Sequence, residues 1–148
     1  MLKLRFSSGS GAAARLVRFT TWSWCSHVGF LLPNGQVIDA TPEFGVAQRV
    51  PDEDGRVEIY GLPYLSPIME ERAVFHARSQ IGKPYDWQGC LNFALRTRSW
   101  RDKNQWFCSE FVAWVLERVR RPLLRTDHVD RITPRDLLLS PRLDPAAW

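Results

Sequence analysis

Cys108 stands at the start of a segment whose apolar residues recur at helical spacing. The repeating positions are Phe111, Val112, Val115, Leu116 and Val119. They predict an amphipathic helix that carries Cys108 in its first turn. A helix N-terminus presents unpaired backbone N–H groups and the positive end of the helix dipole, and both stabilise a thiolate. The pattern therefore indicates a nucleophilic thiol, although a cysteine that only fills space in the core fits it too.

A short turn sequence separates two apolar runs upstream of this helix, which predicts a β-hairpin. A two-residue turn on Asn34 and Gly35 is one option. Pro33 favours another, because proline suits the second position of a type I turn. Gly35 then takes the left-handed conformation of a bulge, and Leu32 and Gln36 close a three-residue loop.

The choice of turn decides whether His27 and Asp39 can meet. With the three-residue loop, Gly29 lies opposite Asp39, and His27 is the diagonal neighbour of Asp39 on the same face, roughly 5–8 Å away. With the two-residue loop, His27 and Asp39 point to opposite faces. The other face of the three-residue hairpin is apolar throughout and is expected in the core; it carries Val28, Phe30, Leu32, Ile38 and Ala40.

These residues supply the groups that a thiol hydrolase needs. Cys108 provides the sulfur nucleophile, His27 holds and later donates the proton, and Asp39 fixes the tautomer of the imidazole. Gly29 is expected to let the helix that carries Cys108 approach the sheet closely.

A metal site would use some of the same atoms. Cys25 and His27 alternate onto one face of a strand and, with Cys90 or Cys108, supply soft ligands. A fourth ligand is missing, and zinc on His27 would silence the proposed base. We therefore predict neither a metal site nor a cofactor.

Three stretches resemble the NlpC-type papain-like hydrolases. Ser-His-Val-Gly-Phe at 26–30, followed by Val-Ile-Asp-Ala at 37–40, resembles the histidine hairpin of that family. Gly-Lys-Pro-Tyr-Asp-Trp at 82–87 resembles its substrate-side tyrosine loop, and Phe-Cys-Ser-Glu-Phe-Val at 107–112 its nucleophile helix. The cysteine precedes the histidine in the ordinary family and follows it here. This order is similar to that of the circularly permuted branch, which contains YiiX-like proteins and lecithin:retinol acyltransferase.

The resemblance implies a role for each matched residue. His27 corresponds to the general base, Asp39 to the group that orients it, and Cys108 to the nucleophile. Tyr85 corresponds to a substrate-side residue that can help to stabilise the oxyanion, and a core aromatic is the alternative. Glu110 fits the permuted branch and is a candidate for the substrate side, or simply complements the helix dipole.

The resemblance also implies a papain-like α+β fold, with an antiparallel sheet of about five strands and the nucleophile helix packed across it. Hydrophobic periodicity and turn residues place the other elements. We expect one domain over residues 1–148, with strands at 2–6, 45–50 and 57–60, an acidic turn at 51–55 joining the last two, and helices at 12–20, 67–81 and from 133 on.

Composition limits the class of protein. The chain has 148 residues, of which 45% are hydrophobic, enough for one domain that buries roughly 70% of its unfolded surface. Residues 1–38 hold four bases and no acid and so carry the whole net charge of +4. No basic helix face or zinc-ligand spacing points to nucleic acid. We expect synthesis in the cytosol without an export signal, no transmembrane segment, and no disulfide framework from three irregularly spaced cysteines.

The resemblance leaves the acyl donor open. Family members cleave peptidoglycan stem peptides, and permuted relatives act on lipid esters. The Ala-Arg-Leu-Val-Arg sequence at 14–18 is similar to that of phage-encoded members, which favours a virion-associated peptidoglycan amidase, with phage tail proteins as partners. A lipid acylhydrolase or acyltransferase would bind vesicles through Trp22, Trp24 or Leu137–Leu139. A non-catalytic tail or assembly protein with a vestigial site would not need Cys108.

Overall fold

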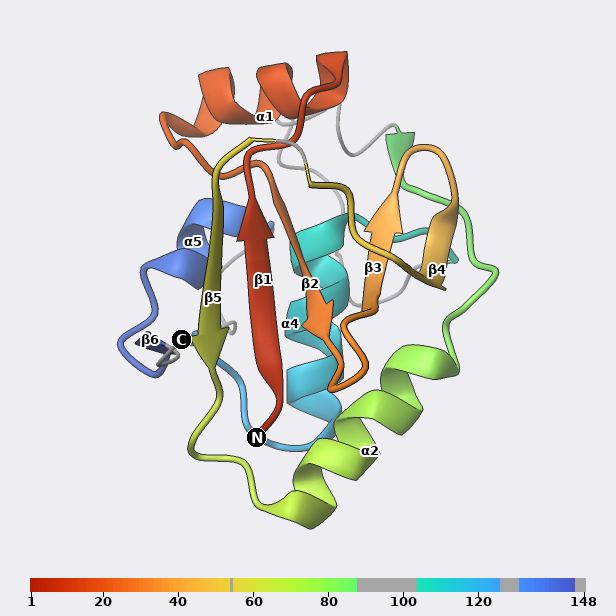
Figure 1. Cartoon of the computed structure of the whole chain (residues 1–148), viewed down its shortest axis with the longest axis vertical. Helices are drawn as coiled ribbons and strands as arrows, with labels where there is room; N and C mark the ends of the chain where they lie inside the picture. The colour runs from red at the N-terminus through yellow and green to blue at the C-terminus, as the bar shows by residue number, and fades with distance from the viewer. Residues whose placement is uncertain (54, 88–103, 126–130, 146–148) are drawn as a thin grey trace.

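The computed structural model describes residues 1–53, 55–87, 104–125 and 131–145. Figure 1 shows an antiparallel sheet of six strands in the order β4-β3-β2-β1-β5-β6, with α4 packed across it. The strands are β1 (Lys3–Ser7), β2 (His27–Leu31), β3 (Val37–Thr41), β4 (Gly45–Arg49), β5 (Val57–Gly61) and β6 (Asp144–Pro145). The described helices are α1 (Ala12–Thr21), α2 (Pro67–Arg78), α4 (Cys108–Arg118) and α5 (Pro134–Leu138).

The α+β class is confirmed, and the sheet has one strand more than the five expected. The additional strand is β6, which has only two residues and pairs with the end of β5. Proline interrupts the strand pattern at Pro145, and so short an edge strand leaves no period-two signal in the sequence.

The predicted register of the hairpin is confirmed. Phe30 pairs with Ile38, and the N–H of Leu32 donates to the carbonyl of Gln36 at 2.8 Å, closing the three-residue loop. Gly35 has a φ of 81°, the left-handed conformation that the bulge requires. Because the alternation of side chains follows from this register, His27 and Asp39 share a face of the sheet.

The prediction that an acidic turn joins the next two strands into a pair is wrong. β4 pairs with β3, and β5 pairs with β1, so that β4 and β5 lie on opposite sides of the central three strands. The chain between β4 and β5 therefore joins opposite sides of the central three strands instead of forming a hairpin. The N-terminal strand β1 takes the place beside β5, and nothing local in the sequence encodes that insertion.

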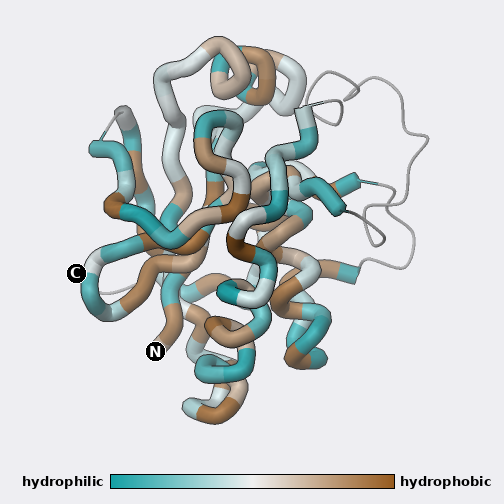
Figure 2. Tube along the Cα trace, turned by 90° about the vertical axis from the view of Figure 1, so that its right-hand side faces the viewer, coloured by the Kyte–Doolittle hydropathy of each residue, from teal (hydrophilic) through white to brown (hydrophobic). Residues whose placement is uncertain are grey.

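Helix α1 lies at one end of the sheet, at the top of Figure 1, and Figure 2 shows hydrophobic residues on this part of the molecule. Val17 lies on the buried side of the helix, whereas Phe19 is 78% exposed. The helix ends at Trp22, which adopts the left-handed conformation at a φ of 52° and is 88% exposed. The side of α1 that faces solvent thus exposes large apolar residues, with Arg15 among them.

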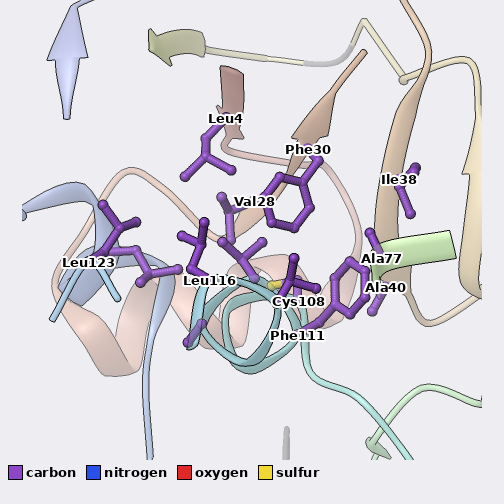
Figure 3. Close-up of a cluster of buried hydrophobic side chains, with 14 of the residues drawn as sticks. Leu4, Val28, Phe30, Ile38, Ala40, Ala77, Cys108, Phe111, Leu116 and Leu123 are labelled. Atoms are coloured by element: carbon purple, nitrogen blue, oxygen red, sulfur yellow. The ribbon is translucent and has the colours of Figure 1, made fainter. Parts of the chain in front are cut away.

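The core lies between the sheet and α4. Figure 3 shows Val28 and Phe30 of β2 gathered with Cys108 and Phe111 of α4. The five apolar positions predicted for the inner face of this helix are all buried: Phe111, Val112, Val115, Leu116 and Val119. Large buried side chains stabilise by about 1.5–3 kcal/mol each, so this face fixes the start of α4 against the sheet.

The capped start predicted at Thr133 is confirmed. Its hydroxyl accepts from the N–H of Asp136, and the Asp136 carboxylate accepts from the N–H of Thr133, a complete capping box. Ser109 on α4 donates to the carbonyl of Ile132 at 2.6 Å. The C-terminal helix is therefore tied to the first turn of α4.

Candidate active site

Cys108 is the first residue of α4 and is 1% exposed. The preceding residue, Phe107, caps the helix with extended backbone and makes no side-chain capping bond. The early N–H groups of the helix are thus not used by a capping side chain. The Cys108 sulfur lies 3.8 Å from the carbonyl oxygen of Ser26, the residue before His27. The helix start and the beginning of β2 are therefore in contact.

His27 and Asp39 meet as the hairpin register predicts. The His27 Nε2 lies 2.8 Å from Asp39 Oδ2, and the two side chains are 18% and 2% exposed. A carboxylate on Nε2 leaves Nδ1 as the ring nitrogen available to a thiol. The structure thus joins His27 to Asp39 through one ring nitrogen and places the Cys108 sulfur against Ser26, the residue before His27.

Arg49, on β4, holds the far side of the same carboxylate. Its Nε donates to Asp39 Oδ1 at 3.1 Å and its Nη2 to Asp39 Oδ2 at 2.9 Å, a bidentate arrangement that fixes the plane of the carboxylate. Its Nη1 donates to Asp52 at 2.9 Å. Asp39 therefore lies between two cationic side chains in a buried position.

Both members of the His27–Asp39 pair have shifted pKa values. Burial alone lowers the pKa of His27, but hydrogen bonds to Asp39 and Cys108 outweigh burial and raise it to about 10. Burial alone raises the pKa of Asp39, but the hydrogen bond and charge of His27, followed by those of Arg49, hold it below its usual value. The pair is therefore a carboxylate beside a protonated imidazole at neutral pH.

A pocket of about 400 Å³ opens over His27. One wall is the inner side of α1, and the floor carries hydroxyl and guanidinium groups from the sheet face opposite the core. The lining residues include Ala13, Ala14 and Val17 from α1, Arg5, Ser7, Ser26 and Arg49 from the floor, and Thr41, Glu43, Phe44, Asp52 and Tyr85 around them. The pocket thus combines an apolar wall with a polar floor.

Tyr85 lines this pocket and is held beside the start of α4. Its backbone forms a parallel bridge with Trp106, and the N–H of Trp106 donates to the carbonyl of Pro84 at 3.1 Å. Its ring packs 5.9 Å from the ring of Phe107. The structure thus brings Tyr85 to the same pocket as His27, on the side where Cys108 begins its helix.

Glu110, the other residue proposed for the substrate side, lies outside the pocket. It is 1% exposed, and its Oε1 lies 4.0 Å from a guanidinium nitrogen of Arg131. Asp86 lies 3.8 Å from the same guanidinium. Glu110 therefore belongs to a buried charged group that ties the first turn of α4 to the chain around Arg131.

The reason predicted for Gly29 is wrong. A Cβ at this position would lie 2.7 Å from the Cβ of Asp39 and 3.2 Å from the carbonyl of Ile38, both on β3. Gly29 therefore makes room for Asp39, and α4 packs on the other face of the sheet. The absence of a side chain at Gly29 is what lets His27 reach across to the carboxylate.

Arg49 and Arg5 were missed by the sequence reasoning. Ala47 on β4 pairs with Asp39. Arg49 lies two residues further along β4, so its side chain points to the same face as Ala47 and Asp39. Pairing β4 with β3 in the sequence would have revealed it, but β4 was assigned to another hairpin.

The alternative metal site is not formed among the described residues, where no three His, Cys, Asp or Glu side chains gather around a common point. Cys25 is buried in the core and its sulfur donates to the carbonyl of His27 at 3.4 Å. Burial raises the pKa of Cys25 to about 12, which disfavours the thiolate that metals require. Cys90 lies outside the described residues.

No protein-family model matches the chain, and no curated protein sequence matches it. The fold is similar to the crystal structure of the metalloprotein YiiX from Escherichia coli O157:H7, with a TM-score of 0.75 and 16% sequence identity over 98% of this chain and 94% of that chain. This likeness agrees with the YiiX-like part of the predicted resemblance. At 16% identity it establishes the fold, and function has to be argued from the site.

Proposed function

We propose that the chain is a papain-like thiol hydrolase that transfers an acyl group from an amide to water. The observation that carries this proposal is the His27–Asp39 pair, with 2.8 Å between His27 Nε2 and Asp39 Oδ2, beside a helix start whose first residue, Cys108, contacts the carbonyl of Ser26 with its sulfur. His27 lines the pocket, whereas Cys108 is buried at the helix start and is not among the lining residues. Nucleophile, base and orienting group in this order are the elements of covalent acyl transfer.

The proposed reaction has two halves. The Cys108 thiolate attacks the carbonyl carbon, and the backbone N–H groups at the helix start stabilise the oxyanion, with Tyr85 as a neighbouring donor. The His27 imidazolium then donates its proton to the departing amine as the C–N bond breaks. Water enters, gives a proton to His27 and attacks the thioester, which releases the carboxylic acid and restores the thiolate–imidazolium pair.

Asp39 has a positioning role in this proposal. Hydrogen bonding to Nε2 fixes the rotation of the imidazole, so that Nδ1 is the nitrogen that faces the thiol. Arg49 in turn prevents the carboxylate from rotating. Because Asp39 is buried and clamped on both sides, the ring of His27 is held in one orientation before substrate arrives.

The substrate class that we propose is the stem peptide of peptidoglycan, attacked by a virion-associated enzyme. This step rests on the resemblance of the three motifs to NlpC-type hydrolases. The polar floor of the pocket supports it, since hydroxyl and guanidinium groups suit a peptide backbone and its carboxylates.

Digestion of purified cell wall, followed by mass analysis of the soluble fragments, tests the proposal. Wild type should release peptide fragments with new amino termini, and Cys108→Ala should release none. The control is Cys25→Ala, which removes a cysteine that packs in the core and is not among the residues that line the pocket over His27. Fragment release by Cys108→Ala at the wild-type rate would contradict thiol catalysis.

A lipid ester is a second candidate substrate, because the outer side of α1 is apolar and basic. Leu16, Phe19 and Trp22 are exposed there beside Arg15, and the helix contains no acid. Aromatic and basic residues on one exposed helix face are typical of helices that lie at the surface of anionic membranes. None of the described helices has the length and apolar character needed to cross a bilayer.

The other residues named for vesicle binding fit less well. Leu137 is fully buried and only Leu139 of that segment is exposed, at 68%, and the Arg56 guanidinium lies 4.4 Å from the centroid of the Trp24 ring. Cosedimentation with phosphatidylglycerol vesicles separates the two candidates. A lipid enzyme should bind these vesicles and lose binding with Phe19→Ser, while Phe75→Ser, on α2 and 69% exposed against 78% for Phe19, should leave it intact. Absence of binding by wild type would exclude the lipid candidate.

A further inference from the structure

The pocket contains a positive charge that the proposed mechanism does not use. Arg5 lies on β1 and lines the pocket, although its residue surface is only 9% exposed. It pairs with Gly29, and Ser7 pairs with His27. Arg5 is thus the diagonal neighbour of His27 on the same face of the sheet, at a separation of about 7–8 Å.

The charge of Arg5 is only partly compensated. One of its Nη nitrogens donates to the backbone carbonyl of Asp52, and no carboxylate among the described residues forms an ion pair with it. Arg49, by contrast, forms ion pairs with both Asp39 and Asp52. Burial lowers the pKa of Arg5, and the raising effect of Asp39 and the other nearby carboxylates does not offset it, as expected for a guanidinium removed from water with no carboxylate bound to it.

We propose that Arg5 is the binding site for a carboxylate of the substrate, a few bonds away from the acyl carbon that Cys108 attacks. This inference rests on the proposed thiol hydrolase function and adds the class of substrate, an amide that carries a nearby free carboxylate. A guanidinium presents two parallel N–H donors that match a carboxylate. The α1 wall of Ala13, Ala14 and Val17 leaves room for the aliphatic carbons that join the two groups.

The charges around Arg5 favour a singly charged anion. Glu43 and Asp52 also line the pocket, and both would repel a doubly charged phosphate more strongly than a carboxylate. Two guanidinium groups and the His27 imidazolium stand against these two acids in the lining, and Asp39, bonded to both His27 and Arg49, balances the third positive charge. A carboxylate therefore fits the pocket better than a phosphate ester.

Alkylation of Cys108 by iodoacetate and by iodoacetamide tests this inference. The reagents have similar size, and only iodoacetate carries a carboxylate. The rate at Cys108, followed by mass analysis of its peptide, gives a ratio of iodoacetate to iodoacetamide that is compared with the ratio for glutathione. Wild type should prefer iodoacetate, and Arg5→Gln should lower the ratio about threefold to tenfold, the effect of removing one charge at this range.

The control is Lys3→Gln, which removes the same charge from the same strand two residues away, outside the pocket. It should leave the ratio within about twofold of wild type, because Lys3 is only partly buried and lies outside the pocket, where solvent screens its charge. A ratio that Arg5→Gln leaves unchanged, or that Lys3→Gln lowers equally, would overturn the assignment. A Cys108 that alkylates no faster than glutathione with either reagent would count against the hydrolase and would still leave the ratio measurable.

A second measurement covers the case in which Arg5→Gln does not fold. Succinate should protect Cys108 of the wild type from iodoacetamide, and inorganic phosphate should protect it less. Arg5→Lys keeps the charge but cannot bind a carboxylate through two parallel donors, so protection by succinate should weaken several-fold. Equal protection of wild type and Arg5→Lys, or better protection by phosphate, would refute a carboxylate site at Arg5.

Discussion

Replacing Asp39 by asparagine should destabilise the fold in a way that depends on pH. Asp39 is buried between His27 and Arg49, so the neutral amide would leave two cations without their shared anion. The rise in the pKa of His27 from 6.5 to about 10 corresponds to about 5 kcal/mol, at about 1.4 kcal/mol for each pKa unit. Cys108 shares in that rise, so the part due to Asp39 is about 2–3 kcal/mol.

The sign follows from the direction of the shift. Because the pKa of His27 is raised in the folded state, its contribution is fully present below the unfolded value of 6.5 and is lost as the pH rises through about 10. The lost bonds to Arg49 add about 1.5–3 kcal/mol, and this part does not change over that range because arginine stays charged. The difference in unfolding free energy between wild type and Asp39→Asn should therefore be about 4–6 kcal/mol near pH 6 and shrink by about half toward pH 10.

Urea denaturation followed by tryptophan fluorescence at several pH values measures this difference. The matched control is Asp52→Asn, which removes a carboxylate that also pairs with Arg49 but whose side chain is 74% exposed. An exposed pair contributes about 0–1 kcal/mol, so this variant should be nearly neutral at every pH. A difference for Asp39→Asn that stays constant from about pH 6 to about pH 10 would refute the reasoning, because the imidazole would then not be its charged partner.

Three further predictions concern the same site and its support. In His27→Ala, alkylation of Cys108 by iodoacetamide at about pH 6 should fall at least tenfold from the wild-type rate, because the imidazolium no longer stabilises the thiolate; equal rates would count against a catalytic pair. Gly29→Ala should lower the free energy of unfolding by about 1–3 kcal/mol, since its methyl group meets Asp39 at 2.7 Å, and unchanged urea stability would show that the strands can part at no cost. Thr133→Ala should lower it by about 0.5–2 kcal/mol by removing the cap of α5; a loss confined to the noise of the urea curves would mean that the cap does not stabilise the helix.

The parts of the site that could be predicted from the sequence are those specified by residues close together in the chain. The hairpin register depends on Pro33 and Gly35, whose backbone preferences act within a few residues. Once that register is known, the alternation of strands puts His27 and Asp39 on one face. The apolar repeat after Cys108 likewise predicts both the helix and its buried side, because the 3.6-residue period is a local property.

The errors lie where a residue's neighbours come from far along the chain. Strands that follow one another in sequence often pair, so β4 and β5 were predicted to form a hairpin. In the structure, β1 lies between β2 and β5, and β4 pairs with β3 instead. The insertion of β1 puts Arg5 beside His27 in the pocket, and the pairing of β4 with β3 puts Arg49 beside Asp39. Glu110 shows the same limit, because its position in the first turn of α4 says nothing about Arg131, which meets it from another segment.

The sequence by itself determined the chemical types and the local frames: a thiol at a helix start, an imidazole and a carboxylate in a defined hairpin register, and a capped C-terminal helix. Only the tertiary structure decided that Arg49 clamps Asp39, that Arg5 faces the pocket, and that α1 forms its wall. Turn and helix preferences act between residues a few positions apart. The order of strands depends on how the whole apolar surface is buried, which no short stretch of sequence specifies.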